Sequence, residues 1–174
     1  MIIIGLDPGK TGAIAILKDG EIIETYRMQS IEKQIDFQDF LRFTDSIQER
    51  FQDKDIVAYL EKVSPIRGSS ASSTFNFGKA YGIKKLFASR YRFKEVKPTQ
   101  WQKVAWDGIT RIAKTEKGKM KTDTKAMSLV AAKRLFPKWD FRNIGVKGQP
   151  LTTYHDGEID AALIAYYGYL DQRG

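Results

Sequence analysis

The first 27 residues contain three strand-like runs separated by tight-turn sequences, and this pattern constrains the fold more than any other part of the chain. Residues 2–6 are almost entirely apolar, as in a central buried strand. Glycines follow in the turn at 8–12, and Asp19 with Gly20 forms a hairpin sequence between the runs 13–17 and 21–27. We therefore expect the sheet to begin with a three-stranded antiparallel meander.

The remaining sequence alternates helix-like and strand-like segments. Expected helices span residues 32–51, 72–89, 98–106, 122–136 and 156–170, and expected strands span 56–60 and 91–96. Because a helix separates it from the meander, the strand at 56–60 is expected to run parallel to the first strand through a right-handed crossover. These elements predict one α/β domain over residues 1–174, with a five-stranded mixed sheet flanked by helices.

Apolar residues recur at three- and four-residue spacings in several expected helices, which predicts their core-facing sides. The stripes are Phe37, Phe40, Leu41, Thr44, Ile47 and Phe51 in the first helix, Met127, Val130, Ala131 and Leu135 in the fourth, and Ile159, Leu163, Tyr166 and Leu170 in the last. Residues 107–121 and 137–150 lack such patterns. We expect a mobile surface excursion in the first of these segments and irregular chain in the second.

Positive charge is concentrated in one continuous segment. Residues 84–147 hold 18 Lys and Arg against 5 Asp and Glu, whereas the rest of the chain holds 11 against 16. This asymmetry is typical of proteins that bind the phosphate backbone of nucleic acids. A solvated basic face is the alternative. A membrane-surface site is disfavoured, because the basic residues do not follow one apolar-faced helix.

The densest run of basic residues lies in the excursion at 107–121. Its members are Arg111, Lys114, Lys117, Lys119 and Lys121. We expect this excursion to clamp DNA, and a disordered loop is the alternative reading.

The composition excludes several classes of protein. A hydrophobic content of 42% with 12% aromatic residues indicates a globular chain and not a disordered one. No apolar run is long enough to cross a membrane, and the first ten residues do not resemble a signal peptide. The absence of cysteine excludes disulfides and thiolate metal sites. We therefore expect a cytoplasmic protein with no membrane partner.

Four acidic residues fall at element ends. Asp7 and Glu61 each close an apolar strand-like run, and Asp156 and Asp160 lie four residues apart on one face of the final helix. A lone carboxylate at the end of a buried strand is unfavourable, whereas several converging carboxylates suit Mg²⁺. Taken singly, each has an ordinary alternative role: a turn residue, a salt-bridge partner, a helix N-cap or a solvated helix residue.

Four segments occur in an order that resembles the RuvC-type Holliday junction resolvases, in particular their phage and organelle branch. The segments are LDPGKTGAIAI, YLEKV, GSSASSTFNFGKAYGI and HDGEIDAALIA. The resemblance covers nearly the whole chain. It implies an RNase H-like fold, a homodimer, and Mg²⁺- or Mn²⁺-dependent hydrolysis of four-way or other branched DNA, in the host cytoplasm if the protein is phage-encoded.

The resemblance assigns the first catalytic Asp to Asp7, the Glu to Glu61 and the last Asp to Asp160. The bacterial pattern has its third carboxylate three residues before the last Asp, where this chain has Gly157. Asp156 is our choice for that role.

His155 remains the alternative to Asp156, as a ligand or proton carrier, or else it is only a neighbour of the helix cap. The resemblance also places Lys125 near the scissile phosphate and makes Lys103 a second DNA-contacting lysine.

Residues 64–82 correspond to the region that lies against the junction centre in the family. From it we expect DNA contacts by Arg67, Ser69, Ser70, Ser73 and Lys79. The loop at 65–68 has no aromatic residue to wedge into a branch point. Phe75 and Phe77 could stack on bases, but core positions are favoured for both, and Trp101 and Trp106 are expected to pack in the core.

The expected chemistry is two-metal hydrolysis, in which Asp7, Glu61, Asp156 and Asp160 hold two Mg²⁺ or Mn²⁺ ions. One rival class is the actin-like or sugar-kinase ATPases, but 174 residues leave no room for their second lobe. A non-catalytic junction-binding module and a nuclease of broader flap or fork specificity remain open. The helix at 72–89, with Gly78, Ala80 and Gly82, is the expected dimer surface.

Overall fold

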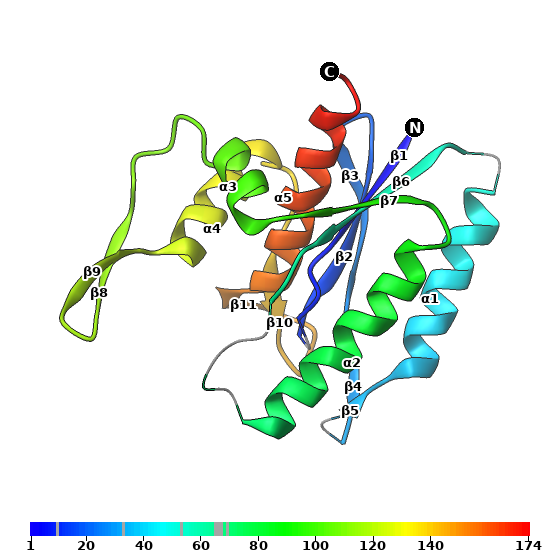
Figure 1. The fold of residues 1–174 in the computed structure, drawn as a ribbon, viewed down its shortest axis with the longest axis horizontal. Helices are drawn as coiled ribbons and strands as arrows, with labels where there is room; N and C mark the ends of the chain where they lie inside the picture. The colour runs from blue at the N-terminus through cyan, green and yellow to red at the C-terminus, as the bar shows by residue number, and fades with distance from the viewer. Residues whose placement is uncertain (10, 33, 53, 65–67, 69) are drawn as a thin grey trace.

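The computed structural model of the protein describes residues 1–9, 11–32, 34–52, 54–64, 68 and 70–174, and its centre is a five-stranded sheet (Figure 1). The strands are β1 (Ile2–Leu6), β2 (Ala13–Lys18), β3 (Glu21–Arg27), β6 (Ile56–Glu61) and β7 (Arg92–Val96), in the order β3-β2-β1-β6-β7. β1, β2 and β3 form the antiparallel meander, and β6 and β7 run parallel to β1. The predicted mixed sheet is confirmed.

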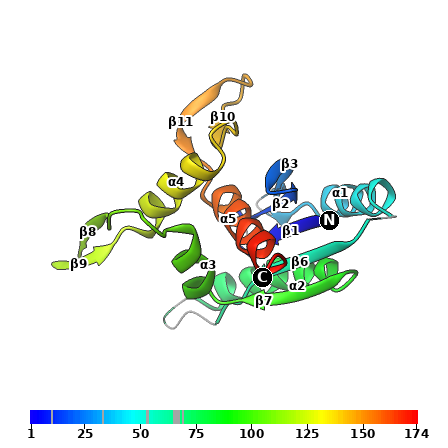
Figure 2. The same ribbon diagram turned by 90° about the horizontal axis from the view of Figure 1, so that it is seen from above.

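Helices cover both faces of this sheet. They are α1 (Phe37–Arg50), α2 (Ala71–Ala88), α3 (Pro98–Ala105), α4 (Thr124–Leu135) and α5 (Asp156–Asp171). Alternate strand residues divide the core: Ile3 and Val57 pack on the side of α3, α4 and α5, whereas Ile4 and Ala58 pack on the side of α1 and α2. Figure 2 shows α5 between the sheet and α4. No helix in the described ranges is long and apolar enough to cross a membrane.

α5 packs directly on the central strand because β1 has a glycine at the contact. A Cβ atom on Gly5 would lie 2.1 Å from the carbonyl oxygen of Ala161 and 2.5 Å from the backbone nitrogen of Ala165. Only glycine permits that approach. The contact fixes the N-terminal turn of α5 relative to the end of β1.

The first helix starts later than its sequence pattern predicts. Residues 30–35 contain a two-stranded ribbon, β4 (Ser30–Ile31) and β5 (Gln34–Ile35), and α1 begins after Asp36, whose side chain accepts a hydrogen bond from the Asp39 backbone nitrogen at 3.0 Å. The expected apolar stripes are partly wrong. Phe37, Leu41, Val130 and Leu170 are exposed.

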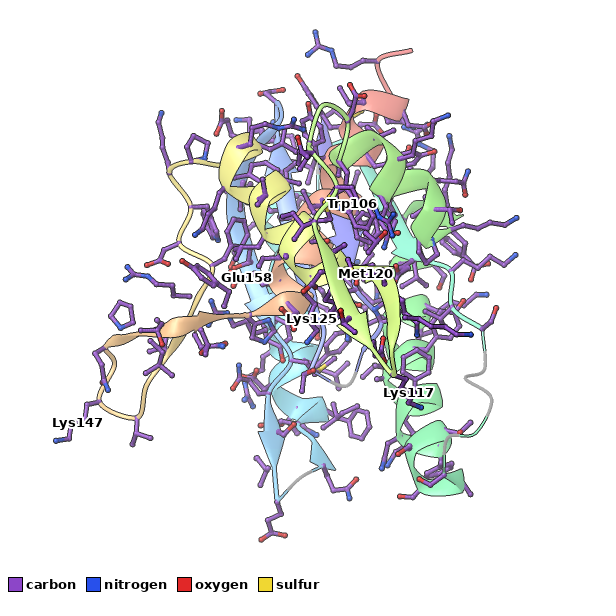
Figure 3. All side chains as sticks on the ribbon, turned by 90° about the vertical axis from the view of Figure 1, so that its left-hand side faces the viewer. Trp106, Lys117, Met120, Lys125, Lys147 and Glu158 are labelled. Carbon is purple, nitrogen blue, oxygen red and sulfur yellow. The ribbon has the colours of Figure 1, made fainter. Side chains whose placement is uncertain are left out.

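Two segments expected to be irregular form hairpins. β8 (Ala113–Glu116) and β9 (Lys119–Thr122) form a hairpin in the expected mobile excursion, and β10 (Arg142–Ile144) and β11 (Pro150–Tyr154) form a second hairpin that begins within the other segment and ends beyond it. Lys117 and Gly118 turn the first hairpin with φ angles of 50° and 73°. Figure 3 shows Lys117 and Lys147 at the tips of the two hairpins.

A buried polar network ties the second hairpin and the meander to α5. Glu158 accepts hydrogen bonds from Arg27 Nε at 2.8 Å, from Trp139 Nε1 at 3.2 Å and from the Thr25 hydroxyl. Arg27 also donates to the carbonyl oxygen of Arg142 at 2.8 Å. The buried carboxylate of Glu158 is therefore paired, which secures the first turn of α5 beside the acidic residues.

Candidate acidic centre

The register of the sheet brings Asp7 and Glu61 to the same edge. β1 and β6 are parallel neighbours in which Leu6 lies opposite Leu60, and Asp7 and Glu61 are the next residues of each chain segment. The turn after β1 is tight: the Gly12 backbone nitrogen donates to the Gly9 carbonyl oxygen at 2.9 Å. The two carboxyl groups therefore come together through backbone pairing and not through flexible loops.

The N-terminal turn of α5 completes the acidic centre. A Cβ atom on Gly157 would lie 2.7 Å from Asp7 Oδ2 and 2.7 Å from the Thr11 carbonyl oxygen. α5 thus begins against the Asp7 turn, with Asp156 and Asp160 on either side of this contact. The same crowding leaves no room at Gly157 for the third carboxylate of the bacterial resolvase pattern.

The pKa values show that these carboxyl groups interact. Burial raises the pKa of Asp7, and the charge of Asp156 adds to this effect. Burial, with a contribution from Asp7, raises the pKa of Glu61 to about 7. Burial, followed by the charges of Asp7, Glu61 and Asp156, raises the pKa of Asp160 to about 8. Burial and the neighbouring carboxylates therefore disfavour the ionised forms of Asp7, Glu61 and Asp160.

Three neighbouring side chains hold the centre in place. Trp101, correctly expected in the core, also donates from Nε1 to Glu61 Oε1 at 3.0 Å. A hydrogen bond from Ser128 lowers the pKa of Asp160 against the effect of burial. The Nζ of the buried Lys84 donates to the Gly9 carbonyl oxygen at 2.8 Å. Sequence reasoning missed Lys84, although its spacing from the buried Ala80, Phe87 and Ala88 marks the inner side of α2.

Asp156 lies at the open side of the centre. Its carboxylate, about half exposed, pairs with Lys125 Nζ at 2.5 Å. Both residues line a hollow of about 40 Å³ between α3, α4 and α5, together with Asp160, Gln102, Thr124, Ser128 and Ile159. The structure thus places Lys125 beside Asp156, and its expected position near a scissile phosphate stays a prediction.

His155 caps α5. Its Nδ1 accepts a hydrogen bond from the Glu158 backbone nitrogen at 3.0 Å, and burial lowers the pKa of the imidazole. The N-cap alternative considered for Asp156 is therefore wrong, because His155 occupies that position. The neutral ring next to Asp156 has one nitrogen committed to the helix.

The donor set suits a hard divalent cation. All four candidate ligands are carboxylates, and a cation would favour the ionised forms of Asp7, Glu61 and Asp160, whose pKa values are raised by burial and by neighbouring carboxylates. Within the described ranges, no three Asp, Glu, His or Cys side chains already converge as metal ligands do. The Lys125 ammonium holds Asp156 in this arrangement. The ion pair uses Asp156 Oδ2 and leaves Oδ1 as an oxygen that could ligate a cation.

The other expected DNA contacts fall in three places. Arg67 and Ser69 lie outside the described residues. The Ser70 side chain caps α2 by accepting from the Ser73 backbone nitrogen at 3.1 Å, and Lys79 Nζ donates to Gln34 Oε1 at 3.2 Å. Lys114, Lys117, Lys119 and Lys121 lie on the β8–β9 hairpin.

Lys103 and the α2 aromatic residues deviate from the expected arrangement. Lys103 lines a separate hollow with Arg134 and Leu170, whereas its neighbour Gln102 faces Asp160. Phe75 is 66% exposed, so the core position favoured for it is wrong; Phe77 is partly buried.

Comparison with known proteins identifies the fold. No protein-family model and no curated protein sequence matches the chain. A solved structure of Thermus thermophilus RuvC in complex with a Holliday junction substrate matches with a TM-score of 0.58 and 13% identity, over 100% of this chain and 96% of that chain. A further Thermus thermophilus RuvC structure matches with a TM-score of 0.53 and 15% identity, over 98% and 97%. The chain therefore has the RNase H-like fold of RuvC.

Proposed function

We propose that the protein is a structure-selective endodeoxyribonuclease that resolves Holliday junctions and other branched DNA. The observation that carries this proposal is that Asp7 and Glu61, at adjacent strand ends of a RuvC-like sheet, both act electrostatically on the buried Asp160 of α5. That one of the similar structures holds a Holliday junction substrate supports the choice of DNA.

The side chains of the centre have distinct roles in this proposal. Two Mg²⁺ or Mn²⁺ ions, held by Asp7, Glu61, Asp156 and Asp160, would activate water and stabilise the leaving 3′ oxygen. Glu61, oriented by Trp101, positions the attacking water. Lys125 turns from Asp156 toward the scissile phosphate, where its positive charge stabilises the negative charge of the transition state.

The basic β8–β9 hairpin is the proposed DNA clamp. Lys114 pairs with Asp123 at 3.5 Å and Lys121 pairs with Glu116 at 3.2 Å, whereas no ion pair among the described residues involves Lys117 or Lys119. These two lysines at the tip are available to phosphates. We also assign Lys103, Ser70, Ser73 and Lys79 to the extended DNA surface, as the family resemblance implies.

A homodimer is the proposed assembly, with α2 at its interface. The outer side of α2 exposes Phe75, Gly78, Gly82 and Leu86, which lie at helical spacing. Ala80, which was also expected at the interface, is instead buried against the sheet. A two-fold axis would place two acidic centres against opposed strands of a four-way junction. We also propose that the protein belongs to the phage and organelle branch of the resolvases and that it acts in the cytoplasm.

Cleavage of a synthetic immobile four-way junction tests the function. We expect paired nicks in the junction and not in a linear duplex of matching sequence, in Mg²⁺ or Mn²⁺. Asp7→Asn should lower cleavage by at least about 100-fold, since even second-shell partners of metal ligands contribute 10- to 100-fold, while junction binding is retained. Equal cutting of flaps or duplex would indicate a broader nuclease. Binding without cutting in either metal would indicate a non-catalytic junction-binding module.

A further inference from the structure

Lys84 is buried in an unusual way. It is the only lysine or arginine among the described residues with a fully buried position, and it extends from the inner side of α2 toward the end of β1. Its Nζ donates to the carbonyl oxygen of Gly9, which also accepts the hydrogen bond from the Gly12 backbone nitrogen. This carbonyl oxygen therefore accepts one hydrogen bond within the turn that follows Asp7 and a second one from Lys84.

A buried ammonium requires compensation, and Lys84 has no direct carboxylate partner. No ion pair within 4.0 Å among the described residues includes it, in contrast to the paired Glu158. Asp7 is the charged group that acts on it. Burial lowers the pKa of Lys84 to about 8, and the charge of Asp7 opposes that change. The Lys84 charge correspondingly lowers the pKa of Asp7 against the effect of burial.

We propose that Lys84 is a positioning residue of the acidic centre, which fixes the turn carrying Asp7 and balances the Asp7 charge until a divalent cation binds. Because Lys84 is fully buried on the side of α1 and α2, it cannot contact DNA and is not a catalytic residue. Its ammonium reaches the turn from the opposite side of the sheet to α5.

This role explains how four carboxylates stay together before a metal arrives. One face of the turn packs against Gly157 of α5, and the other is held by Lys84. The negative charge of Asp7 is offset from inside the protein, by a group on the side of the turn away from α5. The metal-binding half of the inference rests on the proposed function, whereas the coupling of Lys84 to Asp7 does not.

A double-mutant cycle in EDTA tests the coupling. The variants are Lys84→Met, Asp7→Asn and the double variant, each measured by urea unfolding. We expect Lys84→Met to lower the folded-to-unfolded ratio at least tenfold in the native background and less than threefold in the Asp7→Asn background. An equal loss in both backgrounds would show that Lys84 only supports packing, and would overturn the inference.

Two further variants separate charge from hydrogen bonding and from net-charge effects. Lys84→Gln keeps a donor for Gly9 without the charge, so we expect it to show the same dependence on Asp7 as Lys84→Met. It also replaces Lys84→Met in the cycle if that variant does not fold in EDTA. Lys85→Met is the matched control, because Lys85 lies on the same helix but is exposed and pairs with Glu95. Its effect should not depend on Asp7.

Addition of Mg²⁺ tests the second half of the inference. A cation that takes over the balancing of Asp7 should raise the unfolding midpoint of Lys84→Met more than that of the native protein. An equal rise would overturn this half. Neither readout requires cleavage, so loss of the nuclease proposal would leave the coupling test intact, and a failed coupling test would leave the nuclease proposal untouched.

Discussion

At the scale of single residues, the acidic centre holds carboxyl groups in buried positions that disfavour their ionised form. Glu61 and Asp160 have pKa values raised to about 7 and about 8, whereas both would titrate near 4 in an unfolded chain. The folded protein without metal therefore holds protons that the unfolded chain has released. A bound cation would favour the ionised form of these carboxyl groups.

This difference predicts how stability depends on pH. Between about pH 4 and pH 8 the folded state binds more protons than the unfolded state, so its free energy of unfolding falls as pH rises. In EDTA we expect a fall on the order of 1 to 3 kcal/mol from pH 6 to pH 8, measured by urea unfolding. Lys84, with its pKa lowered to about 8, acts in the opposite sense only above that range.

The control for this prediction is Asp160→Asn, which removes the carboxyl group whose pKa is raised to about 8. Most of the decline between pH 6 and pH 8 should disappear in that variant. Saturating Mg²⁺ should also flatten the profile, because a bound cation favours the ionised carboxylates. A native profile that rises with pH over this range would contradict the assigned shifts.

At the scale of elements, the two hairpins carry most of the difference between the predicted and the observed chain. β8 and β9 are exposed along almost their whole length, so they lack the apolar alternation by which half-buried strands are recognised. Lys117 and Gly118 do supply a turn with positive φ, but between polar strands that local signal is weak. The hairpin projects away from the rest of the molecule (Figure 2).

Removal of the tip charges should weaken DNA binding through phosphate contacts. For Lys117→Ala with Lys119→Ala we expect the slope of log affinity against log salt for a four-way junction to fall by about 2. Fluorescence anisotropy at several salt concentrations measures that slope. The matched control is Lys18→Ala with Lys54→Ala, at the opposite end of the sheet, where Lys18 pairs with the first residue of β1 and Lys54 precedes β6. If both pairs reduce the slope equally, the hairpin is not the clamp.

At the scale of the whole molecule, α2 has one side packed against the sheet and one side exposed. Its inner side buries Ala80, Lys84 and Phe87 against the sheet. Its outer side exposes Phe75 and Leu86, with Gly78 and Gly82 between them, where added Cβ atoms would meet nothing within 4 Å. Exposed apolar residues flanking small ones on one helix are suited to close contact with a second copy of the chain.

Gly82→Leu should therefore weaken dimerisation without harming the protomer. The protomer has space for the side chain, and leucine favours a helix by roughly 1 kcal/mol over glycine, so thermal stability should hold or rise. Sedimentation velocity should show a shift from dimer to monomer. Glu49→Leu, an exposed position on α1, is the control. An unchanged dimer in Gly82→Leu would place the interface elsewhere.

The sequence alone was sufficient for the sheet and for the strand-end carboxylates. Apolar runs, the glycines after Asp7 and the Asp19–Gly20 turn act over a few residues, so the meander, β6 and the positions of Asp7 and Glu61 were predictable. The spacing of Asp156 and Asp160 likewise follows from helical geometry. These features depend on local backbone preference and on the alternation of buried side chains.

Only the tertiary structure decided which side chains surround those carboxylates. That Lys84 lies under the Asp7 turn and that Trp101 donates to Glu61 depend on contacts between segments far apart in the chain. A lysine in a helix is ordinarily solvated, and although its spacing from Ala80 and Phe87 marks the inner side of α2, it does not show that the ammonium reaches the Asp7 turn. Burial and long-range electrostatics arise from the packing of α2, α3 and α5 on the sheet, and no local pattern encodes that packing.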